Sequence, residues 1–157
     1  MKKITLLLFI ILGVSFNAIA QEEKKFVSGN SLTYLMPQDL LGDVYGSGYG
    51  VYANFDYNFN KHFVGRFDLG WNTFNGTDIL GITVENQNVW EFSAGARARV
   101  SLFYAEIMGG YYTGFDSWGY KPAIGVRWKK FDLQGNITIL NDVKWVGVRL
   151  GYYWGNN

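Results

Sequence analysis

Apolar and polar positions alternate along most of this 157-residue chain. Tyr49, Val51 and Phe55, for example, share one face of an extended segment, and Asn54 and Asp56 lie on the other. Side chains two residues apart project to the same side of a β-strand, so this period predicts half-buried strands. Seven segments follow the pattern, at residues 49–59, 63–73, 89–100, 103–112, 120–128, 131–139 and 146–154. Residues 27–35 form a weaker eighth segment whose facing the sequence leaves open, and no stretch holds a helical period. The chain is therefore expected to be all-β.

The connections between these segments alternate between short and long. Short turns are expected at residues 60–62, 100–101 and 129–130, and longer loops at residues 36–47, 75–88 and 114–118. Barrels of the bacterial outer membrane have short periplasmic turns and longer extracellular loops. The alternation predicts an eight-stranded, antiparallel, up-and-down transmembrane β-barrel with both chain ends in the periplasm.

Aromatic residues gather at both ends of the apolar faces, with Val, Ala, Leu, Ile and Gly between them. This grading is typical of a lipid-facing band between two aromatic girdles. A soluble sandwich or lipocalin-like barrel would also alternate, but its strands would gain nothing from charges of both signs on the opposite face. The expected girdle residues are Tyr49, Phe59, Phe63, Trp71, Trp90, Phe103, Tyr111, Tyr120, Trp128, Phe131 and Trp154.

The N-terminus has the pattern of an export signal. Lys2 and Lys3 precede an apolar run over residues 4–14, and Ala18 and Ala20 form a small-residue cleavage site. A membrane anchor is the alternative, but a run of about 11 residues is too short to cross a hydrocarbon core of about 30 Å. We therefore expect a signal peptide at residues 1–20, a short tail at 21–25, the barrel at 26–154 and a C-terminal tail at 155–157.

Composition narrows the function classes further. The chain is 48% hydrophobic and 18% aromatic, with 20 glycines and no cysteine, so disulfides, thiol catalysis and a lipidated cysteine are excluded. After removal of two lysines with the signal peptide, 12 basic and 13 acidic side chains remain, a net charge of −1. This balance gives no electrostatic basis for binding nucleic acid.

Over residues 26–154 the sequence resembles the small eight-stranded outer-membrane β-barrels of the OmpA-transmembrane and OmpX type. The resemblance rests on the signal peptide, the eight alternating segments and the aromatic C-terminal strand over residues 144–154. It implies residence in the outer membrane of a Gram-negative-type cell, contact with membrane lipid and lipopolysaccharide, and recognition of the last strand by the barrel-assembly machinery. The chain departs from the family in one respect, because Gly155, Asn156 and Asn157 follow the terminal aromatic residue.

The polar face of the strands carries charges of both signs. Eight strands enclose a lumen that side chains can fill. Five acidic and six basic residues face it, so we expect a plugging network of ion pairs centred on Glu106, Arg97 and Arg127. The expected lumen charges are Asp56, Arg66, Asp68, Glu91, Arg97, Arg99, Glu106, Lys121, Arg127, Asp132 and Arg149. The expected turns place Asp56 opposite Arg66, Arg127 opposite Asp132, and Glu106 opposite Gly95 and diagonal to Arg97.

No catalytic or metal site is expected. His62, the one histidine, lies in a turn on the periplasmic side without an adjacent nucleophile, and Ser93 has no base within its strand. The lumen carboxylates lie on different strands beside basic residues, with no His or Cys among them. We therefore expect neither an enzyme nor a cofactor.

Apolar residues in the first two long loops form a candidate contact patch, because solvent is expected there. The alternative is that they extend the hairpins and pack on each other. The patch comprises Leu40, Leu41, Val44, Tyr45, Ile79, Leu80, Ile82 and Val84. The expected function is structural or surface contact, through adhesion or envelope integrity, with an unidentified surface partner. A narrow channel or a hydrophobic-ligand conduit is the alternative.

Overall fold

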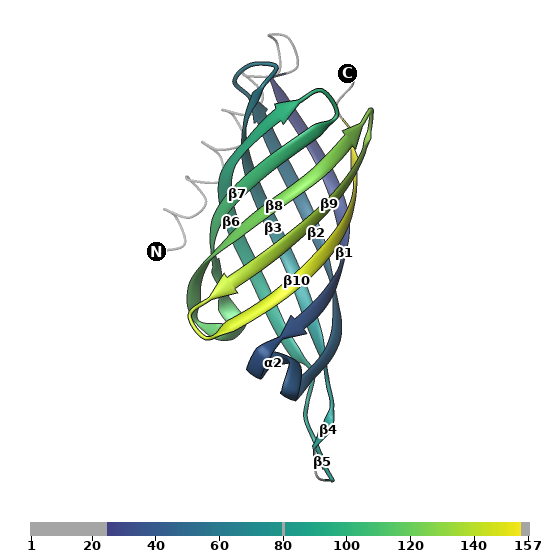
Figure 1. The fold of residues 1–157 in the computed structure, drawn as a ribbon, viewed down its shortest axis with the longest axis vertical. Helices are drawn as coiled ribbons and strands as arrows, with labels where there is room; N and C mark the ends of the chain where they lie inside the picture. The colour runs from purple at the N-terminus through teal and green to yellow at the C-terminus, as the bar shows by residue number, and fades with distance from the viewer. Residues whose placement is uncertain (1–24, 80, 155–157) are drawn as a thin grey trace, which may run out of the picture.

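Eight antiparallel strands close into a barrel in the computed structural model, which describes residues 25–79 and 81–154 (Figure 1). Around the barrel the order is β1, β10, β9, β8, β7, β6, β3 and β2, so every chain neighbour is also a sheet neighbour. The strands are β1 (Phe26–Gln38), β2 (Tyr45–Asn58), β3 (Phe63–Gly76), β6 (Gln87–Val100), β7 (Phe103–Tyr112), β8 (Ser117–Trp128), β9 (Phe131–Leu140) and β10 (Val143–Tyr153). The predicted fold class is confirmed. The expected signal peptide, most of the tail before the barrel and the C-terminal tail lie outside the described residues.

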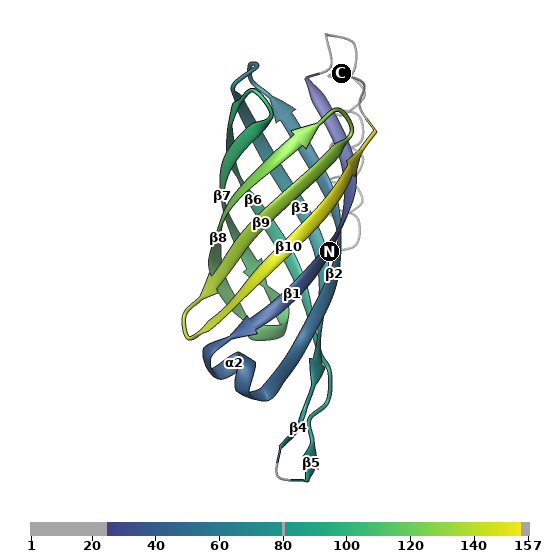
Figure 2. The same cartoon turned by 45° about the vertical axis from the view of Figure 1, so that its right-hand side comes forward.

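Closure depends on the pairing of the first and last strands. β1 pairs with β10 from Gly29 opposite Tyr153 to Gln38 opposite Lys144, and its other edge pairs with β2. Figure 2 shows the tilted strands that form the barrel wall, with β1 between β10 and β2. Since each of the eight barrel strands has a partner on both sides, the barrel wall leaves no ladder edge open to lipid.

The structure settles the facing of β1. Leu32 and Tyr34 point outward, with 65% and 53% of their surface exposed, whereas Ser31, Thr33 and Leu35 are buried in the interior. The strand therefore keeps the same division as the other seven, although its polar face is built from hydroxyl groups rather than charges.

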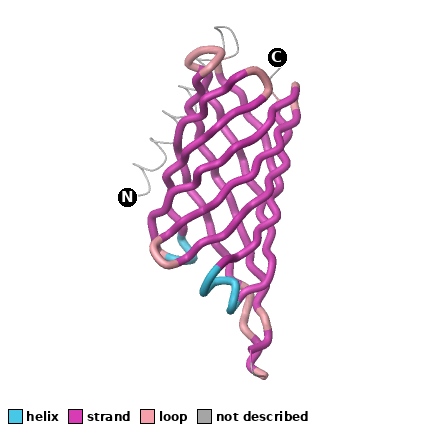
Figure 3. The backbone as a smooth tube through the Cα atoms, in the orientation of Figure 1, coloured by secondary structure: helices cyan, strands magenta, loops and turns pink. Residues whose placement is uncertain are grey.

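The long connections are more ordered than expected. Residues 36–47, predicted as a loop, continue β1, then form the short helix α2 (Asp39–Val44), and then begin β2. In residues 75–88 the short strands β4 (Asp78–Ile79) and β5 (Ile82–Thr83) form a small hairpin of their own. The third connection contains a 3-10 turn, η1 (Thr113–Phe115) (Figure 3). In the described residues no helix is long and apolar enough to cross a membrane.

Two of the three predicted turn registers are confirmed. Asp56 lies opposite Arg66, and Arg127 lies opposite Asp132. The prediction for the turn between β6 and β7 is wrong.

In that turn, Val100 pairs with Phe103, so the turn residues are Ser101 and Leu102. Ser101 adopts a positive φ of 58°, a backbone region that is costly for a β-branched valine. Shifting the turn by one residue lets Val100 stay in the strand. The shift places Glu106 directly opposite Arg97, while Gly95 faces Met108.

The expected girdle residues all lie on the outer surface. Nine of them are exposed, and Trp71 and Tyr111 are half-buried. Tyr49 and Trp71 pack against each other across neighbouring strands, with ring centroids 6.3 Å apart. The apolar face of the sheet therefore points away from the lumen, as a lipid-facing barrel requires and a soluble barrel does not.

Candidate functional site

The charged and polar side chains that are buried in the described residues are concentrated inside the barrel. All eleven expected lumen charges point inward, and nine of them are buried. Arg99 and Arg127, at the turn end, keep 21% and 11% of their side-chain surface exposed. The alternation that directs apolar side chains outward brings these charges together.

The half of the network near the turns centres on Arg97. Its Nε donates to Glu106 Oε2 at 2.7 Å and its Nη1 donates to Asp132 Oδ2 at 2.9 Å. Arg127 Nη1 donates to Asp56 Oδ2 at 2.8 Å, and its Nε lies 3.3 Å from Asp132 Oδ2. The predicted grouping of Glu106, Arg97 and Arg127 is present, joined through Asp132.

The half near the loops centres on two carboxylates. Asp68 accepts from Arg149 Nη1 at 2.6 Å and lies 3.6 Å from Lys121 Nζ. Lys121 also donates to Glu91, which accepts from Ser93 Oγ at 2.7 Å. Each buried carboxylate therefore meets at least one cation, which offsets the cost of removing both from water.

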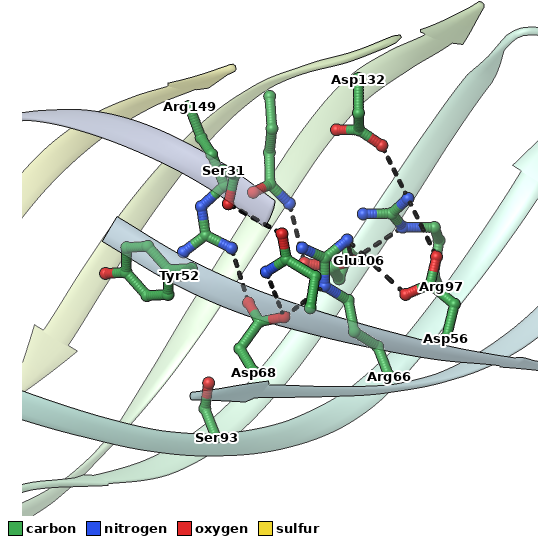
Figure 4. A network of polar contacts seen from close by, with 12 residues as sticks. Ser31, Tyr52, Asp56, Arg66, Asp68, Ser93, Arg97, Glu106, Asp132 and Arg149 are labelled. Atoms are coloured by element: carbon green, nitrogen blue, oxygen red, sulfur yellow. Dashed lines mark hydrogen bonds and ion pairs between the residues drawn. The ribbon is translucent and has the colours of Figure 1, made fainter. Parts of the chain in front are cut away.

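Arg66 links the two halves. Its Nε donates to Asp68 Oδ1 at 2.8 Å, and its Nη1 lies 3.6 Å from Glu106 and 3.8 Å from Asp56 (Figure 4). A single connected network of ion pairs thus runs from the turn end toward the loops.

Tyrosine rings cover the faces of the guanidinium groups. Arg97 stacks 3.7 Å from the centroid of the Tyr104 ring, and Arg149 stacks 3.8 Å from that of Tyr52. A glycine lies directly across the sheet from each tyrosine, and a Cβ on Gly70 would overlap the Tyr52 ring. The lumen glycines therefore make room for aromatic rings that fill space and stabilise the cations.

Several buried polar atoms in the lumen have no hydrogen-bond partner within the protein. They include Arg97 Nη2, Arg149 Nη2, Gln134 Oε1 and Asn136 Nδ2. Buried donors and acceptors are usually satisfied by water when protein groups do not reach them. These atoms would suit individual waters held between the ion pairs.

An apolar cluster closes the loop end of the lumen, and the sequence analysis did not identify it. It comprises Leu35, Leu41, Phe74, Val89, Tyr112, Leu140 and Trp145, with Tyr45, Phe115 and Val143 packed against it. Trp145 is at its centre, with ring centroids 5.3 Å from Phe74 and 5.6 Å from Tyr112. Most of these residues are found when the alternation of inward and outward side chains on each strand is continued for two more residues toward the loops.

The expected contact patch is split by this cluster. Leu41, on α2, is buried beneath the helix and Tyr45 packs beside the cluster, so the patch prediction is wrong for these two residues. Leu41 is carried inward by α2, whereas Tyr45 begins β2 and packs against Phe74. Leu40 and Ile82 remain exposed and Val44 and Val84 are half-buried. Leu80 and the side chain of Ile79 lie outside the described residues.

The residues considered for catalysis lie apart from one another. His62 lies in the turn at residues 60–62, with Nδ1 3.2 Å from the Arg99 carbonyl oxygen. Ser93 is buried and donates to Glu91. In residues 25–79 and 81–154, no group of three or more His, Cys, Asp or Glu is placed to hold a metal ion.

Neither a protein-family model nor a curated protein matches the sequence. Among solved structures, the chain is similar to a de novo designed transmembrane β-barrel, with a TM-score of 0.54 and 12% identity over 82% of this chain and 95% of that one. It is also similar to the outer membrane protein Ail of Yersinia pestis (TM-score 0.48, 13% identity, 82% and 99% covered) and to Neisserial surface protein A (0.43, 14%, 83% and 97%). The fold is that of a small transmembrane β-barrel, as the resemblance implied.

Proposed function

We propose that the protein is an outer-membrane barrel with a structural or surface-contact role, and that it does not conduct ions. The observation that carries this proposal is the occupied lumen. An ion-pair network fills it between the strands, and the apolar cluster around Trp145 caps its loop end.

Opening a pore would cost free energy both in the apolar cap and in the ion-pair network. Water would have to enter a cap whose central residues are almost fully buried, with Phe74 and Tyr112 at 0% exposure. An ion would also have to displace charges that are already paired, and an apolar constriction opposes wetting.

The proposed surface contact rests on exposed apolar side chains at the loop end of the barrel. The β4–β5 hairpin projects past the end of the barrel (Figure 2). Ile82 on the hairpin is 71% exposed, and Leu40 on α2 is 69% exposed. These side chains are available for contact with a neighbouring molecule, lipopolysaccharide or a surface protein, whereas the barrel wall would be covered by lipid.

Planar-bilayer recording tests the closed lumen. We expect the purified barrel to give no stable single-channel currents. A double variant, Phe74→Ala with Trp145→Ala, removes most of the cap and should show whether the ion network alone still closes the lumen. Stable currents from the unchanged protein would contradict the proposal.

A cellular experiment separates the two proposed roles. Deleting the protein should make the cell more sensitive to detergent, because the outer membrane loses a component. Re-expression with residues 78–85 replaced by Asn-Gly should restore resistance if the role is structural, and should fail to restore it if the hairpin makes an essential surface contact. Unchanged resistance after deletion would count against the envelope-integrity role.

A narrow channel is the second candidate. The polar lumen atoms without partners favour it, because they could hold a file of water. The same bilayer recording distinguishes the two functions.

A further inference from the structure

Charges outside the lumen are segregated between the two ends of the barrel. In the described residues, every acidic side chain outside the lumen lies at the loop end, where Lys144 is the one basic residue, and the turn end carries four lysines. The acidic residues are Asp39, Asp43, Asp78, Glu85, Asp116 and Asp142, and the turn-end basic residues are Lys25, Lys61, Lys129 and Lys130. Outside the lumen, the described charges at the turn end are therefore basic.

A hollow of about 590 Å³ opens on the outer wall of the barrel. Most of its lining consists of outward-facing apolar residues, and Asn30 is its outward polar residue. The outward lining residues are Phe131, Leu150, Tyr152, Asn30, Leu32, Val51, Ala53, Leu69, Trp71 and Trp90.

The strand register gives this hollow a direction. Phe131 pairs with Tyr152, Tyr152 with Asn30, and Asn30 with Ala53, so the hollow crosses the strands along their hydrogen bonds as far as Ala53. The direct partner of Ala53 is Leu69, and the paired Trp71 and Trp90 lie two residues further toward the loop end, where Trp90 adjoins the cap residue Val89. Three interstrand steps of about 4.8 Å separate Phe131 from Ala53, a length of about 14 Å. With strands tilted by about 40°, this part of the groove climbs about 9 Å along the barrel axis, which lies within one half of a hydrocarbon core of about 30 Å.

The groove begins beside the basic turn. Phe131 is the first residue of β9 and directly follows Lys129 and Lys130. The Lys130 carbonyl oxygen accepts from the Tyr153 amide at 2.9 Å, which fixes this turn against the end of β10. Lys129 Nζ lies 5.3 Å from the centroid of the Trp128 ring, which is part of the aromatic girdle on this side. Cationic side chains thus stand at the turn-end mouth of a largely apolar groove, and the first part of that groove, from Phe131 to Ala53, lies on the turn side of the wall.

We propose that this groove binds one anionic phospholipid from the turn-side leaflet. Its phosphate lies at Lys129 and Lys130, and one acyl chain follows the groove past Tyr152 and Asn30 toward Ala53. An anionic headgroup is selected because Lys129 and Lys130 are adjacent at the groove mouth, and each lysine near a membrane surface attracts anionic lipid.

Native mass spectrometry of the barrel in detergent tests this site with phosphatidylglycerol and phosphatidylcholine carrying identical acyl chains. We expect one phosphatidylglycerol to be retained per barrel, with an affinity about 10-fold to 30-fold above that of phosphatidylcholine. The double variant Lys129→Ala with Lys130→Ala should lose this preference. Ala53→Trp, which fills the middle of the groove, should weaken the binding of both lipids.

Lys61→Ala is the matched control, because Lys61 is a turn-end lysine on the turn between β2 and β3, away from the groove mouth. This variant should keep the preference. A shift in electrophoretic mobility on heating verifies that each variant is folded. Equal retention of the two lipids, or the same loss in Lys61→Ala as in the double variant, would overturn the proposal, and so would a lipid-free dimer that covers the groove.

Discussion

At the scale of single residues, Glu106 bears most directly on the stability of the lumen. It accepts from Arg97 at 2.7 Å and from Gln134 Nε2 at 2.7 Å, and it lies 3.6 Å from Arg66. Glu106→Gln removes one charge from between two arginines, and breaking a buried ion pair typically costs about 3–5 kcal/mol. We expect the free energy of unfolding in lipid vesicles, measured with urea, to fall by about 3 kcal/mol.

Glu85→Gln provides the matched control for this change, because Glu85 is exposed at the loop end. Its effect should stay within about 0.5 kcal/mol. Equal stability of the Glu106→Gln variant and the unchanged protein would show that the lumen charges do not hold the barrel together.

The outer wall makes a separate prediction, at Ala96. This residue faces outward between Gly65 and Ile107 on the neighbouring strands. Ala96→Arg should cost about 2–4 kcal/mol if the wall is in the middle of a bilayer, whereas Ala96→Leu should cost almost nothing. Urea unfolding in vesicles measures both, and an arginine tolerated as well as the leucine would contradict a lipid-facing wall.

Its neighbour Gly95 makes the complementary prediction for the inner face. A Cβ there would overlap the backbone of Ile107 and Met108. Gly95→Leu should therefore prevent folding, measured as loss of the mobility shift on heating. A folded Gly95→Leu barrel would show that the lumen has room that the structure does not.

At the scale of the elements, the sequence predicts the strands far better than the joints between them. The two-residue period determines which side chains point into the lumen, and it does so for every charged position on all seven clearly patterned strands. It does not determine where a strand ends, because an added pair of residues keeps the same facing. The β6–β7 register was misplaced for this reason, since backbone conformation at Ser101 decides it.

Helix α2 was missed for a related reason. Its six residues are too few to show a helical period, and its structure depends on tertiary contacts of Leu41 with the cap of the lumen. For the cap residues, the sequence predicts that the side chains point inward, but it does not predict that they form a cap. Side chains such as Phe74 follow the inward phase of their strands, yet only closure of the barrel brings them together.

The turn between β6 and β7 provides a test of this backbone argument. A positive φ at Ser101 costs an L-residue about 1 kcal/mol, which glycine largely avoids. Ser101→Gly should therefore raise the free energy of unfolding by about 0.5 kcal/mol, and Ser101→Val should lower it by about 1 kcal/mol or more. Urea unfolding in vesicles measures both, and a more stable valine variant would contradict the assigned turn.

At the scale of the whole molecule, closure of the sheet is the property on which the lumen, the cap and the outer groove all depend. β10 pairs with β9 on one side and β1 on the other, so it is the strand that joins the two ends of the chain. The β4 and β5 strands, in contrast, pair only with each other among the described residues. Deletions in these two places should therefore have opposite consequences.

Deleting residues 143–157 removes β10 and leaves ladder edges on both β1 and β9. Unpaired backbone groups cannot be satisfied in lipid, so the truncated chain should fail to fold in vesicles and should aggregate. Replacing residues 78–85 by Asn-Gly shortens the projecting hairpin and keeps the pairing of β3 with β6. This variant should resist SDS without boiling and change mobility on heating, as the unchanged protein should. A truncated chain that still shows the heat shift would mean that seven strands close without β10, which the observed register does not allow.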